Sequence, residues 1–292
     1  MTLNLHGRVA IVTGGGAGLG RSHALLLASR GAKLVVNGRG HTESRARVDA
    51  VVEEIRNAGG DAIASYDSVE QAEGGAAMVA TAIAAYGKVD VLINNAGFLR
   101  DRSFLKVELE DIEAVIRVHL MGTIYCTKAV WPLMNEQGYG RIIFTTSMAA
   151  TSGNFGQCAY GAAKAGVLGL MNSLALEGRK QNVLVNALSP AAATGMTEGM
   201  FDEETARAFR PELVSPAVAW LSSERCHVSG HTITAGRGAF GRVHYFETAG
   251  VRFGVGEPAT VEAFDAQFQA VDALAGAEEC AIGSRMRAAF PA

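Results

Sequence analysis

Residues 8–20 read RVAIVTGGGAGLG, a short apolar run followed by a glycine-rich turn. The run predicts a buried β-strand, and the apolar helical pattern from Arg21 to Ser29 predicts a helix directly after the turn. In such a unit the helix dipole and free N–H groups face an anion, and glycine lets the backbone come close. The stretch therefore predicts a nucleotide phosphate cradle, with an ordinary tight turn as the alternative. The cradle residues are Gly14, Gly16, Gly18, Leu19 and Gly20.

The alternation of strand and helix continues along the chain. Strands are predicted at 33–37, 61–66, 88–93, 140–146, 182–188 and 231–234, and helices at 43–57, 70–86, 109–135, 155–178 and 216–221. This order predicts an α/β protein with a doubly wound, Rossmann-type parallel sheet of about seven strands and helices on both faces. Residues 1–248 would form a single dinucleotide-binding catalytic domain. Residues 249–292 would form an extension, whose amphipathic helix (about 260–275) packs on the domain or on a neighbouring subunit.

Composition narrows the class of protein. The 292 residues are 49% hydrophobic and 19% charged, with a formal net charge of −3, so nucleic acid is not an expected partner. No apolar run is long enough to span a bilayer, and no signal peptide or membrane association is expected. The four cysteines are widely spaced, which argues against a disulfide framework or a metal site and favours a cytoplasmic location.

The segment from Ser147 to Lys164 carries the chemistry. Tyr160 and Lys164 are four residues apart and would share one face of a helix, while Ser147 follows a predicted strand. An ammonium beside a phenol should lower the phenol pKa from its usual ~10. A phenol tuned in this way can exchange a proton with an alcohol oxygen, which Ser147 could also hydrogen-bond. The alternative is a surface pair at helical spacing.

Further candidate residues lie just after predicted strands, where ligands bind in such sheets. Gly38-Arg39 follows the second strand without an acid, which favours NADP over NAD, with a solvated loop charge as the alternative. Asp67 could accept from the adenine amino group or cap the next helix. The tetrapeptide Asn94-Asn95-Ala96-Gly97 would lie at the cofactor or form a plain turn. His119, on an apolar helical stripe, is either a satisfied core histidine or a relay group beneath Lys164.

Taken together, Thr13-Gly14-x3-Gly18-x-Gly20, Asn94 to Gly97, Ser147 and Tyr160-x3-Lys164 resemble the motifs of the short-chain dehydrogenase/reductase superfamily over about Leu5 to Ala239. Segments such as 94–103 (NNAGFLRDRS), 153–157 (GNFGQ) and 173–180 (SLALEGRK) resemble the dehydrogenase domain of the peroxisomal multifunctional enzyme type 2 family, also called 17β-hydroxysteroid dehydrogenase type 4. The closer resemblance implies a (3R)-hydroxyacyl-CoA dehydrogenase-like protein and favours NAD.

The resemblance also implies roles for particular residues. Tyr160 would be the general acid/base, Lys164 would lower its pKa and bind the nicotinamide ribose, and Ser147 would orient the substrate oxygen. The implied cofactor contacts add Asp67, Ser68, Asn94, Asn95, Ala96, Gly97, Pro190 and Thr194. Helices 109–135 and 155–178 would form a homodimer or homotetramer surface. Three departures stand out, namely Gly38 for an Asp, His119 for the superfamily's Asn, and Pro190-Ala191 for Pro-Gly.

The sequence thus predicts an NAD(P)(H)-dependent oxidoreductase that interconverts a secondary alcohol and a ketone, most closely a 3-hydroxyacyl-CoA dehydrogenase. A hydroxysteroid or other bulky alcohol is the alternative substrate, because the predicted lid, residues 191–214, has only Arg207 and Arg210 to meet CoA phosphates. A cofactor-binding protein without catalysis is the remaining alternative, against which the intact Ser147, Tyr160 and Lys164 argue.

Overall fold

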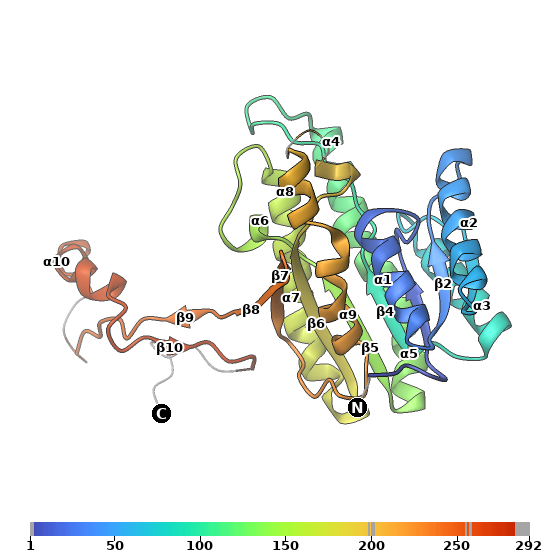
Figure 1. The fold of residues 1–292 in the computed structure, drawn as a ribbon. Coiled ribbons are helices and arrows are strands. Elements are labelled where there is room, and N and C mark those ends of the chain that lie inside the picture. The colour runs from blue at the N-terminus through green and yellow to red at the C-terminus, as the bar shows by residue number, and fades with distance from the viewer. Residues whose placement is uncertain (1–2, 198, 200–201, 255, 257–258, 284–292) are drawn as a thin grey trace. The chain divides into compact units, whose positions relative to one another are not determined.

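The structure is a computed structural model that describes residues 3–197, 199, 202–254, 256 and 259–283. The chain divides into two compact units, Met1–Arg242 and Val243–Ala292. In the first unit, eight strands form one sheet in the order β3-β2-β1-β4-β5-β6-β7-β8 (Figure 1). Each neighbouring pair from β3 to β7 is parallel. The strands are β1 (Val9–Val12), β2 (Lys33–Asn37), β3 (Asp61–Ser65), β4 (Val91–Asn94), β5 (Gly140–Thr145), β6 (Val183–Ala191), β7 (Thr232–Gly236) and β8 (Ala239–Val243).

Helices cover both faces of this sheet (Figure 1). Leu27, Val51 and Val218 from α1, α2 and α9 belong to one buried cluster, and Met78, Val130 and Val167 from α3, α5 and α7 to the other. The central strands β1, β4 and β5 are therefore buried on both sides and lack polar alternation, as expected of a parallel sheet. The helices are α1 (Gly18–Ser29), α2 (Thr42–Asn57), α3 (Ala72–Tyr86), α4 (Leu109–Ile116), α5 (Gly122–Gln137), α6 (Met148–Thr151), α7 (Cys158–Glu177), α8 (Glu203–Ala208) and α9 (Ser215–Leu221).

The predicted doubly wound sheet is confirmed, with eight strands where about seven were expected. The eighth strand, β8, follows β7 through Arg237 and Gly238, which both have positive φ (53° and 74°). Two such residues form the tight turn of an antiparallel hairpin. The strand is mostly exposed and glycine-containing, so it carries no apolar run that a sequence pattern could reveal.

The predicted helix over residues 109–135 is divided into three pieces. A π-helical turn, η1 (Arg117–Met121), separates α4 from α5. Such turns are rare and frequently occur at functional sites, and this one contains His119. Three short 3₁₀ segments also occur, namely η2 (Arg179–Gln181), η3 (Gly195–Thr197) and η4 (Pro211–Leu213). The last two, with α8, lie in the predicted lid.

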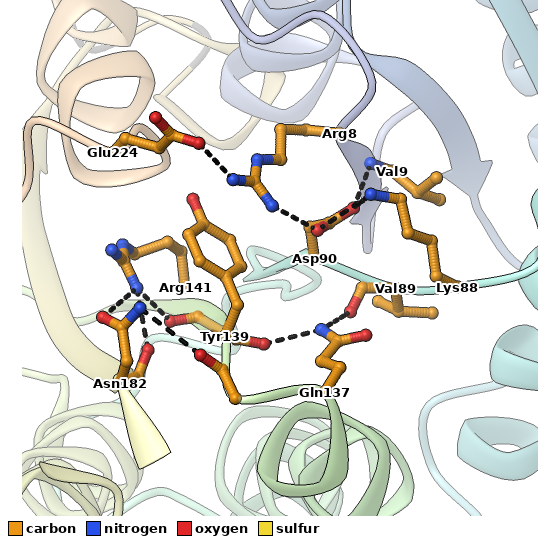
Figure 2. A network of polar contacts seen from close by, with 12 residues as sticks. Arg8, Val9, Lys88, Val89, Asp90, Gln137, Tyr139, Arg141, Asn182 and Glu224 are labelled. Atoms are coloured by element: carbon orange, nitrogen blue, oxygen red, sulfur yellow. Dashed lines mark hydrogen bonds and ion pairs between the residues drawn. The ribbon is translucent and has the colours of Figure 1, made fainter. Parts of the chain in front are cut away.

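A polar network joins the amino ends of the strands (Figure 2). Asp90, 2% exposed, accepts from Val9 N at 2.9 Å and from Arg8 Nη1 at 2.8 Å, and pairs with Lys88 Nζ at 3.0 Å. The ring of Tyr139 lies between the guanidinium groups of Arg8 and Arg141, 3.7 and 4.3 Å from its centroid. This network is at the end of the sheet opposite to the carboxyl ends of the strands.

The second unit is small. It contains an antiparallel pair, β9 (Phe246–Glu247) with β10 (Glu278–Glu279), and the helix α10 (Val261–Asp272). Thr260 caps α10 by accepting from Ala263 N at 3.1 Å. The described side chains of α10 are all at least partly exposed, and its packing on the domain or on another subunit stays a prediction. Within the described ranges, no helix is both long and apolar enough to cross a membrane.

Candidate active site

The glycine turn after β1 and the Asn94–Gly97 turn after β4 are tied together at the carboxyl ends of these strands. The hydroxyl of Thr13 accepts from the backbone N–H groups of Asn95 and Ala96, both at 3.0 Å. The Asn95 side-chain amide in turn donates to the carbonyls of Thr13 at 3.0 Å and Gly14 at 3.3 Å. Asn95 therefore fixes the shape of the glycine turn.

The glycine turn leaves no space for side chains. A Cβ on Gly20 would lie 2.2 Å from the Gly14 carbonyl oxygen, and one on Gly14 (φ +64°) would lie 2.9 Å from Ala96 Cα. The helix α1 begins here at Gly18, and no described side chain caps its first turn. Its N–H groups are therefore available to a ligand, which is the arrangement that holds a dinucleotide pyrophosphate. The residues present fit such a group.

A cavity extends from this turn to the ends of β2, β3 and β4. Asp67 lies on its wall, where the carboxylate accepts from Ser65 Oγ at 3.0 Å. Ser68 does not line it, and its hydroxyl accepts from Glu70 N at 3.2 Å. The lining residues are Gly14, Gly16, Ala17, Asn37, Gly38, Arg39, Ser44, Arg47, Asp67, Val69, Glu70, Ala96, Gly97, Phe98 and Val118.

The end of the cavity beside β2 is cationic. Arg39 and Arg47 both line it, and Arg47 is ion-paired with Glu43 one turn earlier on α2. A Cβ on Gly38 would lie 2.5 Å from Val48 Cγ2 and 3.0 Å from Ser44 Oγ. A side chain at position 38 would therefore require the Val48 side chain to shift. Sequence reasoning missed Arg47, which becomes visible only once α2 is placed against the end of β2.

Ser147, Tyr160 and Lys164 come together where β5 ends. Ser147 caps α6 by accepting from Ala149 N at 3.1 Å, and its hydroxyl lies near enough to the Tyr160 phenol to lower the phenol pKa. Tyr160 and Lys164 are one turn apart on α7, with the ammonium 5.7 Å from the phenol ring centroid. Lys164 is 3% exposed and donates to the Thr145 carbonyl at 2.5 Å.

Burial is the largest cause of the pKa shifts of Lys164 and Tyr160. It lowers the pKa of Lys164 from 10.5 to about 7. It also raises the pKa of Tyr160, an effect that the Ser147 hydrogen bond opposes and the nearby Asp101 charge reinforces. That Lys164 lowers the Tyr160 pKa stays a prediction.

His119 lies within the same site, with its ring edge-on to Tyr160 at a centroid distance of 5.1 Å. Nε2 is 2.7 Å from the Phe98 carbonyl oxygen and 3.2 Å from Phe98 N. The shorter contact favours a proton on Nε2, which makes Nδ1 the acceptor nitrogen of the neutral ring, whereas the longer contact, in which Phe98 N–H donates to Nε2, fits the other tautomer. Burial and the Lys164 charge lower the His119 pKa to about 3. Nδ1 is buried and has no hydrogen-bond partner in the part of the chain that the structure describes.

The remaining candidates are placed differently. The Asn94 side chain is buried and donates to Thr127 Oγ1 at 3.2 Å, so it points away from the cavity. Pro190 lies in β6, paired with Ala235. Thr194 stands over the glycine turn, because a Cβ on Gly18 would lie 3.2 Å from Thr194 Cβ. Its hydroxyl accepts from Met196 N at 3.3 Å.

Comparisons with known proteins identify the family of the chain. The short chain dehydrogenase family matches residues 8–205. The chain is 47% identical to peroxisomal multifunctional enzyme type 2 of Drosophila melanogaster over 267 residues, which cover 89% of this chain and 44% of that protein. A solved structure of the full-length Drosophila enzyme superposes with a TM-score of 0.82 at 40% identity, over 96% of this chain and 48% of the other. A 3-oxoacyl-[acyl-carrier-protein] reductase of Synechocystis is 41% identical over 243 residues, 80% of this chain and 97% of the reductase.

The chain belongs to the short-chain dehydrogenase family and is an oxidoreductase. It is an NAD(P)-dependent member of that family, acting on CH–OH groups. The chain spans about half the length, 44%, of the Drosophila relative.

Proposed function

We propose that the protein interconverts a 3-hydroxyacyl thioester and the corresponding 3-oxoacyl thioester. The observation that carries this is that Ser147, Tyr160 and Lys164 come together at the carboxyl end of the sheet, with His119 packed on Tyr160 and bonded to Phe98 of the cavity wall. The name of the Synechocystis relative specifies a 3-oxoacyl thioester substrate, and the resemblance to the multifunctional enzyme family implies the CoA form. The Synechocystis name supports a thioester, whereas the multifunctional enzyme family also carries a hydroxysteroid dehydrogenase name, so a steroid is the competing substrate in the test.

In this reaction Ser147 hydrogen-bonds the substrate oxygen and Tyr160 transfers the proton. The nicotinamide cofactor, when bound, accepts or supplies the hydride. During reduction the phenol donates its proton to the developing alcohol oxygen, and during oxidation the phenolate accepts the hydroxyl proton. The raised pKa of Tyr160 keeps the phenol protonated in the free protein. Acid–base catalysis of this kind contributes about 10²–10⁴-fold.

Lys164 and His119 support that transfer. Among the described residues the Lys164 ammonium has one hydrogen bond, to the Thr145 carbonyl, and its other N–H groups face the nicotinamide ribose in our proposal. His119 Nδ1 offers an acceptor beside Tyr160 and Lys164, where it can hold a water that returns the proton. We propose this role for His119 over that of a satisfied core histidine, because Nδ1 has no partner among the described residues.

We also propose a preference for NADP(H). Arg39 and Arg47 supply positive charge where the adenosine ribose would lie, and Gly38 offers no carboxylate to a ribose hydroxyl. Arg39→Ala should raise KM for NADP about 10–100-fold and leave KM for NAD nearly unchanged, given about 1.5–3 kcal/mol for a charge-assisted hydrogen bond. Arg45→Ala is the matched control, because Arg45 on α2 does not line the cavity and donates to the Gly40 carbonyl at 2.8 Å. Equal losses with both cofactors would reject the preference.

The substrate is tested by nicotinamide absorbance with NAD and NADP in parallel. The substrates are a (3R)-3-hydroxyacyl-CoA, a 3-oxoacyl thioester of acyl carrier protein and a 17β-hydroxysteroid. Thioester turnover that is lost in Tyr160→Phe, while cofactor affinity is retained, would support the proposal. Turnover of the steroid alone would contradict it.

Assembly and location are part of the same proposal. We propose a homodimer or homotetramer in the cytoplasm, with the four cysteines free as in the structure. The Drosophila relative is named as a peroxisomal enzyme, so the location of this protein in the cell is the measurement that tests the cytoplasmic proposal.

A further inference from the structure

The loop that follows β4 connects two parts of the site. We call residues 98–103 (FLRDRS) the strap. At its start, the Phe98 carbonyl accepts from His119 Nε2 at 2.7 Å. At its other end, Arg102 N donates to the Gly156 carbonyl at 2.9 Å, and Gln157 Nε2 donates to Asp101 Oδ2 at 2.7 Å. The strap thus runs from the histidine that packs on Tyr160 to the residues that precede the Tyr160 helix.

Gln157 has unusual hydrogen bonds for a residue at the start of a helix. It is the N-cap of α7, yet no described side chain caps that helix. Its amide oxygen instead accepts from Asn154 Nδ2 at 3.0 Å, while its amide nitrogen binds Asp101. Tyr160 is three residues further, within the first turn of α7. Any movement of Gln157 therefore moves the backbone that carries the catalytic phenol.

We propose that Asp101 is a positioning residue for Tyr160: it ties the strap to the first turn of α7 through Gln157 and places a carboxylate beside the phenol. The contacts close a ring that runs from Tyr160 to His119, Phe98, the strap, Asp101, Gln157 and back along α7. The consequence for turnover rests on the function proposed above.

The charges around the Tyr160 phenol determine the direction in which Asp101 shifts the phenol pKa. The groups that face Tyr160 are Ser147, His119 and Lys164, besides Asp101. The Asp101 charge raises the pKa of Tyr160, because a carboxylate disfavours the phenolate. With Asp101 present, the phenol stays protonated to a higher pH, which favours the direction that reduces a ketone.

The test compares Asp101→Asn, which keeps the oxygen that accepts from Gln157, with Asp101→Ala, which removes the bond as well. Asp111→Asn is the matched control, because Asp111 is the other carboxylate bound to the strap, through Arg100. Tyr160 ionisation is followed by the ultraviolet difference spectrum between each variant and the same variant carrying Tyr160→Phe. This measurement needs no substrate.

For Asp101→Asn we expect the midpoint of Tyr160 ionisation to fall by a few tenths of a pH unit. The shift is small because the Asp101 carboxylate is exposed and its charge is screened by solvent. The pH at which the reduction rate falls on the alkaline side should decrease by the same amount. KM should stay within about twofold, because the oxygen that accepts from Gln157 is kept. Asp101→Ala should show the same shift and a lower kcat. An unshifted midpoint in Asp101→Asn, or an equal shift in Asp111→Asn, would overturn the proposal. A shifted midpoint without thioester turnover would instead reject the proposed function alone.

Discussion

Lys164→Met is expected to stabilise the cofactor-free protein at neutral and acidic pH, although it removes a residue of the active site. Lys164 is 3% exposed and its ammonium binds the Thr145 carbonyl alone among the described residues. Burial lowers its pKa from 10.5 to about 7, so holding the charge in the folded protein costs free energy. Methionine has a similar length and no charge to desolvate.

The magnitude follows from linkage. A pKa of 10.5 in the unfolded chain and about 7 in the folded protein corresponds to about 5 kcal/mol, at about 1.4 kcal/mol for each pH unit. Because the unfolded chain keeps its proton in this interval, the wild-type free energy of unfolding rises from about pH 7 to pH 10.5. Loss of the hydrogen bond to the Thr145 carbonyl costs about 1–3 kcal/mol. The variant should therefore be about 2–4 kcal/mol more stable at pH 6 and lose this advantage near pH 10.

Urea unfolding at pH 6, 8 and 10, followed by the fluorescence of Trp131 and Trp220, measures the difference. Lys106→Met removes an exposed lysine and serves as the control, with little change expected at any of these pH values. A Lys164→Met protein less stable than the wild type at pH 6 would refute the reasoning. So would an advantage that is the same at pH 6 and pH 10.

Two further substitutions test the candidate active site and the polar network at the opposite end of the sheet. Gly97→Ala should lower kcat by at least about tenfold and destabilise the protein by about 1–3 kcal/mol, because its Cβ would lie 2.2 Å from His119 Cε1. Steady-state kinetics and thermal unfolding measure this, and Gly169→Ala, whose Cβ would meet nothing within 4 Å, is the control. Asp90→Asn should cost about 2–4 kcal/mol in urea unfolding, since it leaves Arg8 and Lys88 without their shared carboxylate. Activity at saturating substrate should remain, because this network is at the opposite end of the sheet from the site, and a loss of activity without a loss of stability would contradict that separation.

Much of the fold was predictable because burial leaves a pattern in the sequence. The strands Val9–Val12 and Gly140–Thr145 are buried along their whole length, and their apolar runs are visible without a structure. The exposed strand Ala239–Val243 leaves no such pattern, since its register depends on a turn at Arg237-Gly238. The π turn at Arg117–Met121 was also hidden, because the buried residues on either side keep ordinary helical spacing.

The candidate site could be predicted where its residues are close in sequence or follow strands. Tyr160 and Lys164 are one helical turn apart, and Ser147 follows a strand, so their meeting follows from the fold. The ionisation of the trio was not predictable, because it depends on how deeply Lys164 is buried. Position alone also could not show that the Asn94 side chain turns inward to Thr127, whereas that of Asn95 binds the glycine turn.

The hydrogen bond between Asp101 and Gln157 shows why contacts between distant parts of the chain are missed in a sequence and how they can be recognised. It is 56 residues from Gln157 in the sequence, and neither residue belongs to an apolar pattern, so no periodicity connects them. The local sign is the start of α7, where Gln157 caps no helix with its side chain because its amide is bound elsewhere. The start of α1 likewise lacks a side-chain cap among the described residues, and there the free N–H groups face the dinucleotide cavity. Because α3 and α4 also begin without a side-chain cap, a missing cap alone does not mark the site, and what distinguishes Gln157 is that its amide binds both Asn154 and Asp101.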